Sequence, residues 1–399
     1  MRGRRLAARA KLDALESAEF TKPLALFPLS ARPMQPISPR MHNADARATR
    51  IRHDAVALVL LATTLLAKSG VRDDIARTVA ELLVDADLMG HTTHGLALLA
   101  PYLDEIAKGG MRASGEPTLL ESRTATQFWD GNRLPGPWLT RRAFDAASAL
   151  AREHGTGTVV IRRSHHIACL AVYLPPITAR GQMGVVHCSD ANGESVAPFG
   201  GLTAVFTPNP FAAGIPTSGD PILLDISASY TTNGLTQRLF QQGARLPHPW
   251  VQDTRGNATD DPAVLFNEPK GTLLPLGGHD AGHKGFALAL LVEALTAGLA
   301  GLGRADPKEG WGATVFVQVI DPSAFGGVDA MRRQMDHIVA ACHASAPRDP
   351  ANPVRLPGER AQKLAREQRA HGVVLDASIL PLIAPWAHKL GVTMPSPMR

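Results

Sequence analysis

Cysteine and long apolar stretches are both scarce in this sequence. Its cysteines, Cys169, Cys188 and Cys342, include no Cys-x-x-Cys pair, and their odd number is typical of a cytoplasmic protein without structural disulfides. No stretch reaches the roughly 18 uninterrupted apolar residues that a membrane-spanning helix needs. The longest, at 286–301, is interrupted by Glu293. We therefore expect neither a membrane protein nor a disulfide-stapled scaffold.

The sequence also lacks a basic stripe interleaved with aromatic residues. The formal net charge is +5, and much of the basic excess lies at 1–11 and 47–53. Nucleic acid is therefore not an expected partner. The paired arginines near the start are not followed by the apolar segment of a secretory signal. We expect a cytoplasmic protein whose partner is a small-molecule substrate.

Several enzyme signatures are missing. The sequence contains neither the Gly-x-Ser-x-Gly motif of α/β-hydrolases nor a P-loop. The strings nearest to the Rossmann fingerprint, at 155–160 and 301–306, both lack its third glycine. The sequence therefore predicts that any nucleotide is bound by a fold other than Rossmann.

The sequence pattern divides the chain into an extension and a folded region. Residues 1–46 are rich in Pro, Arg and Ser without a sustained period, which predicts a flexible extension. Beyond it, helical spacing and short β-branched runs alternate, which predicts an α/β protein with a mixed sheet. The expected helices lie at 73–90, 96–109 and 139–155, and the expected strands at 158–161, 183–187, 222–227 and 314–320.

Three histidine clusters are bounded by glycine or serine, at 90–95, 162–168 and 277–285. In two of these clusters the spacing between the histidines is one that zinc ligands often have. Neither supplies the internal glutamate of the His-Glu-x-x-His motif, and the surrounding glycines disfavour a firm helix. We expect no metal site, and a metal-dependent hydrolase stays an alternative.

The ordered motifs of this chain resemble the malate/L-lactate dehydrogenase type 2 family, which includes ureidoglycolate, sulfolactate, diketogulonate and cyclic-imine reductases. The resemblance extends from about residue 82 to residue 357. It rests on ADLMGHTTHGLALLAPYL, WDG, VIRRSHHIA, VAPFGG, PNPFAAGIPT, LLDIS, LPLGG, GHKGFALALLVEAL and VRLPGER.

This resemblance implies an oxidoreductase that transfers a hydride between NAD or NADP and a small 2-hydroxy or 2-oxo acid such as malate or lactate. It also implies a homodimer with a non-Rossmann α/β fold. We expect a helical and dimerisation lobe at 47–125 plus 280–399 and a cofactor lobe at 126–279. A cyclic-imine carboxylate reductase and a non-catalytic family member stay open as alternatives.

The resemblance also implies site residues. His94, in Thr-His-Gly, matches the family's catalytic histidine, and its ordinary pKa near 6.5 suits proton transfer at neutral pH. His166 matches a second family histidine, and Asp225 the strand end that touches the nucleotide; with His94 they are the expected catalytic residues. Lys284 matches a basic residue before a glycine-headed helix. The expected cofactor-binding residues are Leu223, Leu224, Asp225, Ile226, Ser227, His283, Lys284, Gly358 and Glu359.

One position departs from the family. Many members carry an arginine four residues after the catalytic histidine, where it grips the substrate carboxylate. Here that residue is Leu98, which cannot form the bidentate pair that a guanidinium makes. Arg162 and Arg163 could replace it only if His166 lies in the same pocket.

Overall fold

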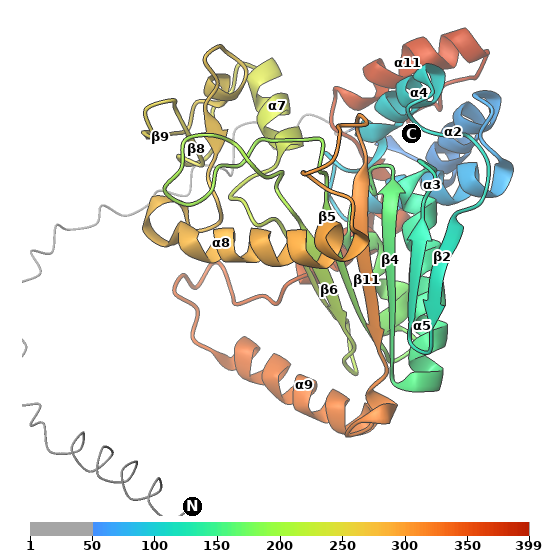
Figure 1. The fold of residues 1–399 in the computed structure, drawn as a ribbon, viewed down its shortest axis with the longest axis vertical. Coiled ribbons are helices and arrows are strands. Elements are labelled where there is room, and N and C mark those ends of the chain that lie inside the picture. The colour runs from blue at the N-terminus through green and yellow to red at the C-terminus, as the bar shows by residue number, and fades with distance from the viewer. Residues whose placement is uncertain (1–50, 399) are drawn as a thin grey trace, which may run out of the picture. The chain divides into compact units, whose positions relative to one another are not determined.

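The computed structural model describes residues 51–398 (Figure 1). The extension predicted at 1–46 lies outside the described residues. None of the helices in the described part is long and apolar enough to cross a membrane. The helices are α2 (Ala55–Lys68), α3 (Asp73–Leu88), α4 (Leu99–Lys108), α5 (Gly136–His154), α6 (Pro175–Thr178), α7 (Asn233–Gln241), α8 (Gly278–Glu293), α9 (Val328–Ala344), α10 (Glu359–His371) and α11 (Ile379–Leu390).

A seven-stranded mixed sheet runs through the molecule in the order β2-β3-β4-β11-β5-β6-β7. Only β3 and β4 pair in parallel, and every other neighbouring pair is antiparallel. This order differs from the parallel Rossmann sheet, so the predicted non-Rossmann α/β fold is confirmed. The strands are β2 (Thr118–Arg123), β3 (Thr126–Asp130), β4 (Thr156–Ser164), β11 (Ala313–Ile320), β5 (Met183–Ser189), β6 (Phe211–Ile215) and β7 (Ile222–Ile226).

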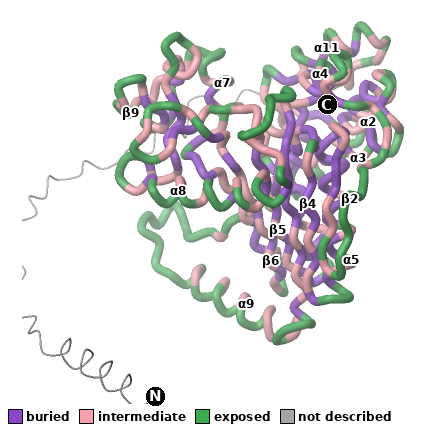
Figure 2. The backbone as a smooth tube through the Cα atoms, viewed as in Figure 1, coloured by how far each residue is buried: buried purple, intermediate pink, exposed green. Residues whose placement is uncertain are grey.

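Helices cover both faces of this sheet. Side chains alternate between faces along a strand, and on β11 Val315 and Val317 join the main core, which includes apolar residues of α5. Phe316 points to the other face and packs with Ala300 and Leu295, in the segment that continues α8. The sheet is therefore buried on both sides at its centre (Figure 2).

The first and last parts of the described chain pack together. Helices α10 and α11 contact α2, α3 and α4, and the short strands β1 (Arg52–His53) and β12 (Val373–Val374) pair antiparallel. Strand β11 lies in the centre of the main sheet although it falls within 280–399. The two predicted lobes therefore share one sheet.

A smaller unit stands beside the sheet. Strands β8 (Val251–Gln252), β9 (Ala258–Thr259) and β10 (Thr272–Leu273) form a second sheet, near which α7 lies (Figure 1). These strands are only two residues long, and a run that short carries no periodic signal. The sequence pattern therefore missed this sheet.

Helix α8 has a break near its start. The helix begins at Gly278 and breaks at Ala281, which has a φ of −132°. Lys284 therefore lies in the first turn after the break, beside glycines at a helix start as expected. Glycine supplies the flexibility for this start, because Gly277 and Gly278 both adopt positive φ angles.

Candidate active site

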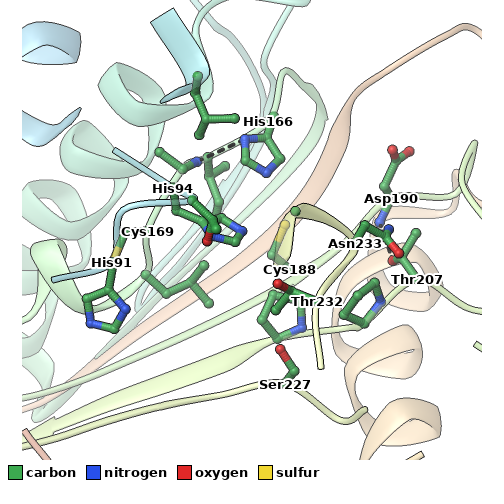
Figure 3. Close-up of a pocket in the computed structure, with 18 of the residues that line it drawn as sticks. His91, His94, His166, Cys169, Cys188, Asp190, Thr207, Ser227, Thr232 and Asn233 are labelled. Atoms are coloured by element: carbon green, nitrogen blue, oxygen red, sulfur yellow. Dashed lines mark hydrogen bonds between the residues drawn. The ribbon is translucent and has the colours of Figure 1, made fainter. Parts of the chain in front are cut away.

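A cavity of about 540 Å³ opens beside the ends of the central strands. It collects residues that lie far apart in the sequence, from the loop after α3, the loop after β4, β7 and the start of α7 (Figure 3). His94, His166 and Asp225, the three residues expected to be catalytic, all line it. The structure therefore brings the expected catalytic set into one place.

A buried acid holds the loop that carries His94. Asp87, in the last turn of α3, is fully buried, and its Oδ2 accepts a hydrogen bond of 2.7 Å from the backbone N–H of Leu96. A Cβ on Gly95 would lie only 2.4 Å from the Asp87 carboxyl carbon, so glycine is required there. Burial raises the pKa of Asp87 to about 7.

His94 faces the cavity beside a hydroxyl and a second imidazole. Its Nδ1 lies 2.8 Å from Thr93 Oγ1, and its ring stacks on that of His166 with centroids 6.0 Å apart. Desolvation lowers the pKa of His94, although the negative charge of Asp225 opposes that shift. The imidazole is therefore neutral at neutral pH and can accept a proton.

His166 is fixed in one neutral tautomer. Its Nδ1 accepts a hydrogen bond of 3.2 Å from the backbone N–H of Ala168 and lies 2.9 Å from the Tyr102 hydroxyl. Because Nδ1 is an acceptor, the ring proton resides on Nε2. Burial and the neighbouring histidines hold the pKa of His166 well below its usual value. His166 is therefore a hydrogen-bond donor with no charge.

Asp225 ties the cavity wall together from β7. Its Oδ2 accepts a hydrogen bond of 2.9 Å from the backbone N–H of Ala171, and Cys169 Sγ lies 3.6 Å from the same oxygen. Asp225 is not an N-cap of the helix that follows β7, because Thr232 caps α7. The carboxylate instead anchors the loop that follows His166.

The expected cofactor residues divide into two groups. Asp225 and Ser227 line the cavity, whereas the other expected residues do not. Gly358 lies against Leu223, whose backbone N–H donates to the Pro357 carbonyl over 3.1 Å. Those that lie outside the cavity lining are Leu223, Leu224, Ile226, His283, Lys284, Gly358 and Glu359.

None of the described residues that line this cavity is a lysine or an arginine. Arg162 and Arg163 both pair with the buried Asp130, at 3.0 and 2.6 Å. They do not reach the cavity, although His166 does. Leu98, at the position where many family members carry an arginine, lies in the cavity wall. A substrate carboxylate therefore finds no fixed cationic side chain here.

Sequence reasoning missed several residues of the site. Tyr102 and Trp311 pack around His166, with the Trp311 and His166 ring centroids 4.9 Å apart. Cys188 and Asp190, at the end of β5, also line the cavity. The aromatic residues carry no motif of their own, so no sequence signal marked either of them.

A second cavity adjoins the first. It has a volume of about 650 Å³ and shares Asn233 and Gln237 with the first cavity. Its wall includes Phe266 and Lys270, and Lys270 is the one lysine or arginine among its described lining residues. The two cavities are therefore neighbours, and Lys270 and Glu194 are the charged side chains among the described lining residues of the second.

Comparison with known proteins gives consistent matches over most of the chain. Residues 54–383 match the family model described as malate/L-lactate dehydrogenase. L-sulfolactate dehydrogenase of Methanothermobacter thermautotrophicus is 30% identical over 338 residues, which cover 83% of this chain and 94% of that protein.

Solved structures also match. Malate dehydrogenase from Pyrococcus horikoshii has 26% identity and a TM-score of 0.79, and the match covers 88% of this chain and 99% of that one. Delta1-piperideine-2-carboxylate reductase from Pseudomonas syringae has 26% identity and a TM-score of 0.73, over 84% of this chain and 99% of that one.

Proposed function

This chain belongs to the malate/L-lactate dehydrogenase family, and we propose that it is an oxidoreductase that interconverts a small 2-hydroxy acid and the corresponding 2-oxo acid with NAD or NADP. The observation that carries the proposal is the stacked pair of His94 and His166 in one cavity with Asp225. Such a site supplies a proton acceptor, a neutral hydrogen-bond donor and a carboxylate.

His94 is the acid/base of the proposed reaction. In oxidation, its neutral imidazole takes the proton of the substrate hydroxyl while the hydride leaves the carbon that carries that hydroxyl. In reduction, the imidazolium returns that proton to the carbonyl oxygen. Asp225 stabilises the imidazolium, since its charge raises the pKa of His94. The Nε2–H of His166 donates to the substrate oxygen and orients it.

The cavities suit a nicotinamide cofactor. They share Asn233 and Gln237, so an elongated molecule can occupy both. Ser227 lies beside Asp225 in the first cavity, where it can contact the nicotinamide end of the cofactor. Lys270 lies in the second cavity, where its positive charge suits a phosphate of the cofactor. When bound, the nicotinamide supplies or accepts the hydride. Lys284 remains a second candidate for a phosphate contact.

A cyclic-imine carboxylate reductase is the second candidate. Two carboxylates, Asp190 and Asp225, line the cavity without a lysine or arginine among the described residues of its wall. That balance favours a substrate group that gains positive charge, such as a protonated imine. One relative of similar structure is a delta1-piperideine-2-carboxylate reductase.

A substrate screen tests both candidates. The full chain is assayed in both directions by the absorbance of the reduced nicotinamide, with NAD(H) and NADP(H), lactate, malate, sulfolactate and a cyclic imine carboxylate. Turnover of a hydroxy acid supports the first candidate, and turnover of the imine alone supports the second. Nicotinamide binding without turnover across the panel would instead favour a non-catalytic member.

We also propose a cytoplasmic homodimer. None of the residues of α9 is buried, and Leu290, Leu291 and Leu299 on and beside α8 are about half exposed or more, at 48%, 50% and 59%. Apolar side chains left exposed in this way suit a subunit interface. Light scattering on the full chain tests the dimer, and a monomer at all concentrations would contradict it.

A further inference from the structure

His91, Cys169 and Asp225 form a cluster that the sequence did not suggest. Each offers one possible ligand atom, and these three atoms all lie within 4.8 Å of one another. The residues come from the loop after α3, the loop after β4 and strand β7. All three line the cavity that holds His94, and Figure 3 shows His91 and Cys169 on one side of it.

We propose that these three residues form a binding site for a divalent transition-metal ion of the zinc class. An imidazole nitrogen, a thiolate and a carboxylate oxygen are the ligand types that Zn²⁺ accepts. Three protein ligands with one open position are typical of catalytic zinc sites, whereas structural sites are closed by four. All three residues line the cavity, so a substrate in the cavity could reach an ion held there.

The ligand atoms are available for this role. The ring nitrogens of His91 have no hydrogen-bond partner among residues 51–398, and the same holds for Oδ1 of Asp225. Asp225 Oδ2 is fixed by the Ala171 N–H at 2.9 Å, which orients the carboxylate without using its other oxygen. Such outer contacts commonly position metal ligands. Binding displaces the proton of the Cys169 thiol to solvent.

The charge of the cavity gives the ion a role. Its wall contains two carboxylates and, among the described residues, no lysine or arginine, so an acid substrate finds no cationic side chain in that wall. A divalent ion that replaces one thiol proton makes the site more positive by one unit and offers a coordination position to a substrate oxygen. Coordination of the substrate by the ion is a second step that rests on the proposed function, whereas the metal site itself does not.

Cobalt titration tests the site. The full chain is stripped with a chelator, dialysed and titrated with Co²⁺, which reports its ligands through its absorption spectrum. We expect one equivalent to bind with a sulfur-to-cobalt charge-transfer band. Cys169→Ser should abolish that band, and His91→Ala should keep it while affinity falls more than about tenfold. Cys188→Ser is the matched control, since Cys188 lines the same cavity outside the cluster.

Two results would overturn the metal site: no stoichiometric Co²⁺ binding, or an unchanged charge-transfer band in Cys169→Ser. Melting temperatures of both variants, measured without metal, establish that they are folded. His91→Ala keeps the test valid if Cys169→Ser does not fold, because unchanged affinity in that variant also contradicts the site.

Lactate and malate then separate the metal from the function. If either acid is turned over and also shifts the cobalt spectrum, the ion ligates the substrate. Turnover with an unchanged spectrum overturns that second step. If Co²⁺ binds through Cys169 but no hydroxy acid is turned over, the proposed function fails and the metal site stands.

Discussion

The Tyr102 hydroxyl lies 2.9 Å from Nδ1 of His166 and 3.1 Å from the carbonyl oxygen of the same residue. Tyr102 is fully buried in α4, so the helix fixes the hydroxyl in space. It thereby fixes both the backbone and the ring of His166. Tyr102 does not line the cavity and acts on the substrate only through His166.

Tyr102→Phe should therefore lower kcat by about tenfold and leave the KM for the cofactor nearly unchanged. The substitution removes hydrogen bonds worth about 1 kcal/mol each and frees the His166 ring to rotate. Steady-state kinetics measure the split between kcat and KM. In a His166→Ala background the same substitution should have almost no further effect on kcat. Additive losses would show that Tyr102 acts independently of His166.

Asp87 gives the fold a pH dependence of unusual sign. Burial raises its pKa from 3.8 to about 7, so the folded chain holds this proton more tightly than the unfolded chain does. The associated stability is present below about pH 4 and is lost as pH rises to about 7. Asp87→Asn keeps an acceptor for the Leu96 N–H and removes the ionisation. The variant should therefore gain stability relative to the wild type between these pH values.

Urea unfolding at several pH values measures this gain. Its upper limit is about 4 kcal/mol, since each pKa unit corresponds to about 1.4 kcal/mol. Asp87→Ala is the contrasting variant, because it leaves the Leu96 N–H without its partner and should destabilise the chain below about pH 4, where the wild-type carboxyl is uncharged. A constant difference between Asp87→Asn and wild type across the range would contradict the buried ionisation.

His94→Ala should lower turnover by about two to four orders of magnitude, the usual contribution of a positioned acid/base. Desolvation lowers the pKa of His94, so oxidation by the wild type should rise with pH and level off above an apparent pKa below 6.5. The variant should lose that limb and keep its cofactor affinity. His388→Ala is the control, because His388 is exposed near the end of α11. A folded His94→Ala enzyme with near-normal turnover would end the proposed mechanism.

Much of the fold could be predicted because local patterns agree with it. The β-branched runs predicted at 158–161 and 314–320 lie in β4 and β11, which pair at the sheet centre. Gly109 and Gly155 end their helices in left-handed conformations, as glycine favours. Boundaries of the predicted elements shifted by a few residues, as where the helix expected to begin at 139 starts at Gly136.

The site could be predicted only where a motif marks it. His94 and His166 were found through the family resemblance, and the structure places both in one cavity. Tyr102 has the spacing of an ordinary core residue, so its polar end gave no signal. Cys169 belongs to no cysteine motif; it is buried, and it also lines the cavity. Contacts that depend on tertiary packing leave no such pattern in the sequence.

Leu98→Arg should convert the cavity into one that binds dicarboxylic acids more tightly. Leu98 lies in the wall of a cavity that has no lysine or arginine among its described lining residues, at the position where many family members carry an arginine. A charge-assisted bidentate pair contributes about 1.5–3 kcal/mol. The KM for oxaloacetate or malate should therefore fall by roughly tenfold or more.

The charge rather than the size of the new side chain should produce this gain. Leu98→Met, which changes the shape of the wall without adding charge, should leave the KM values for both acids nearly unchanged. The gain in Leu98→Arg should shrink as salt is added, because ions screen a pair that is partly open to solvent. Equal KM values in Leu98→Arg and Leu98→Met would contradict the prediction. That result would mean that a cation at position 98 does not pair with the carboxylate of the substrate.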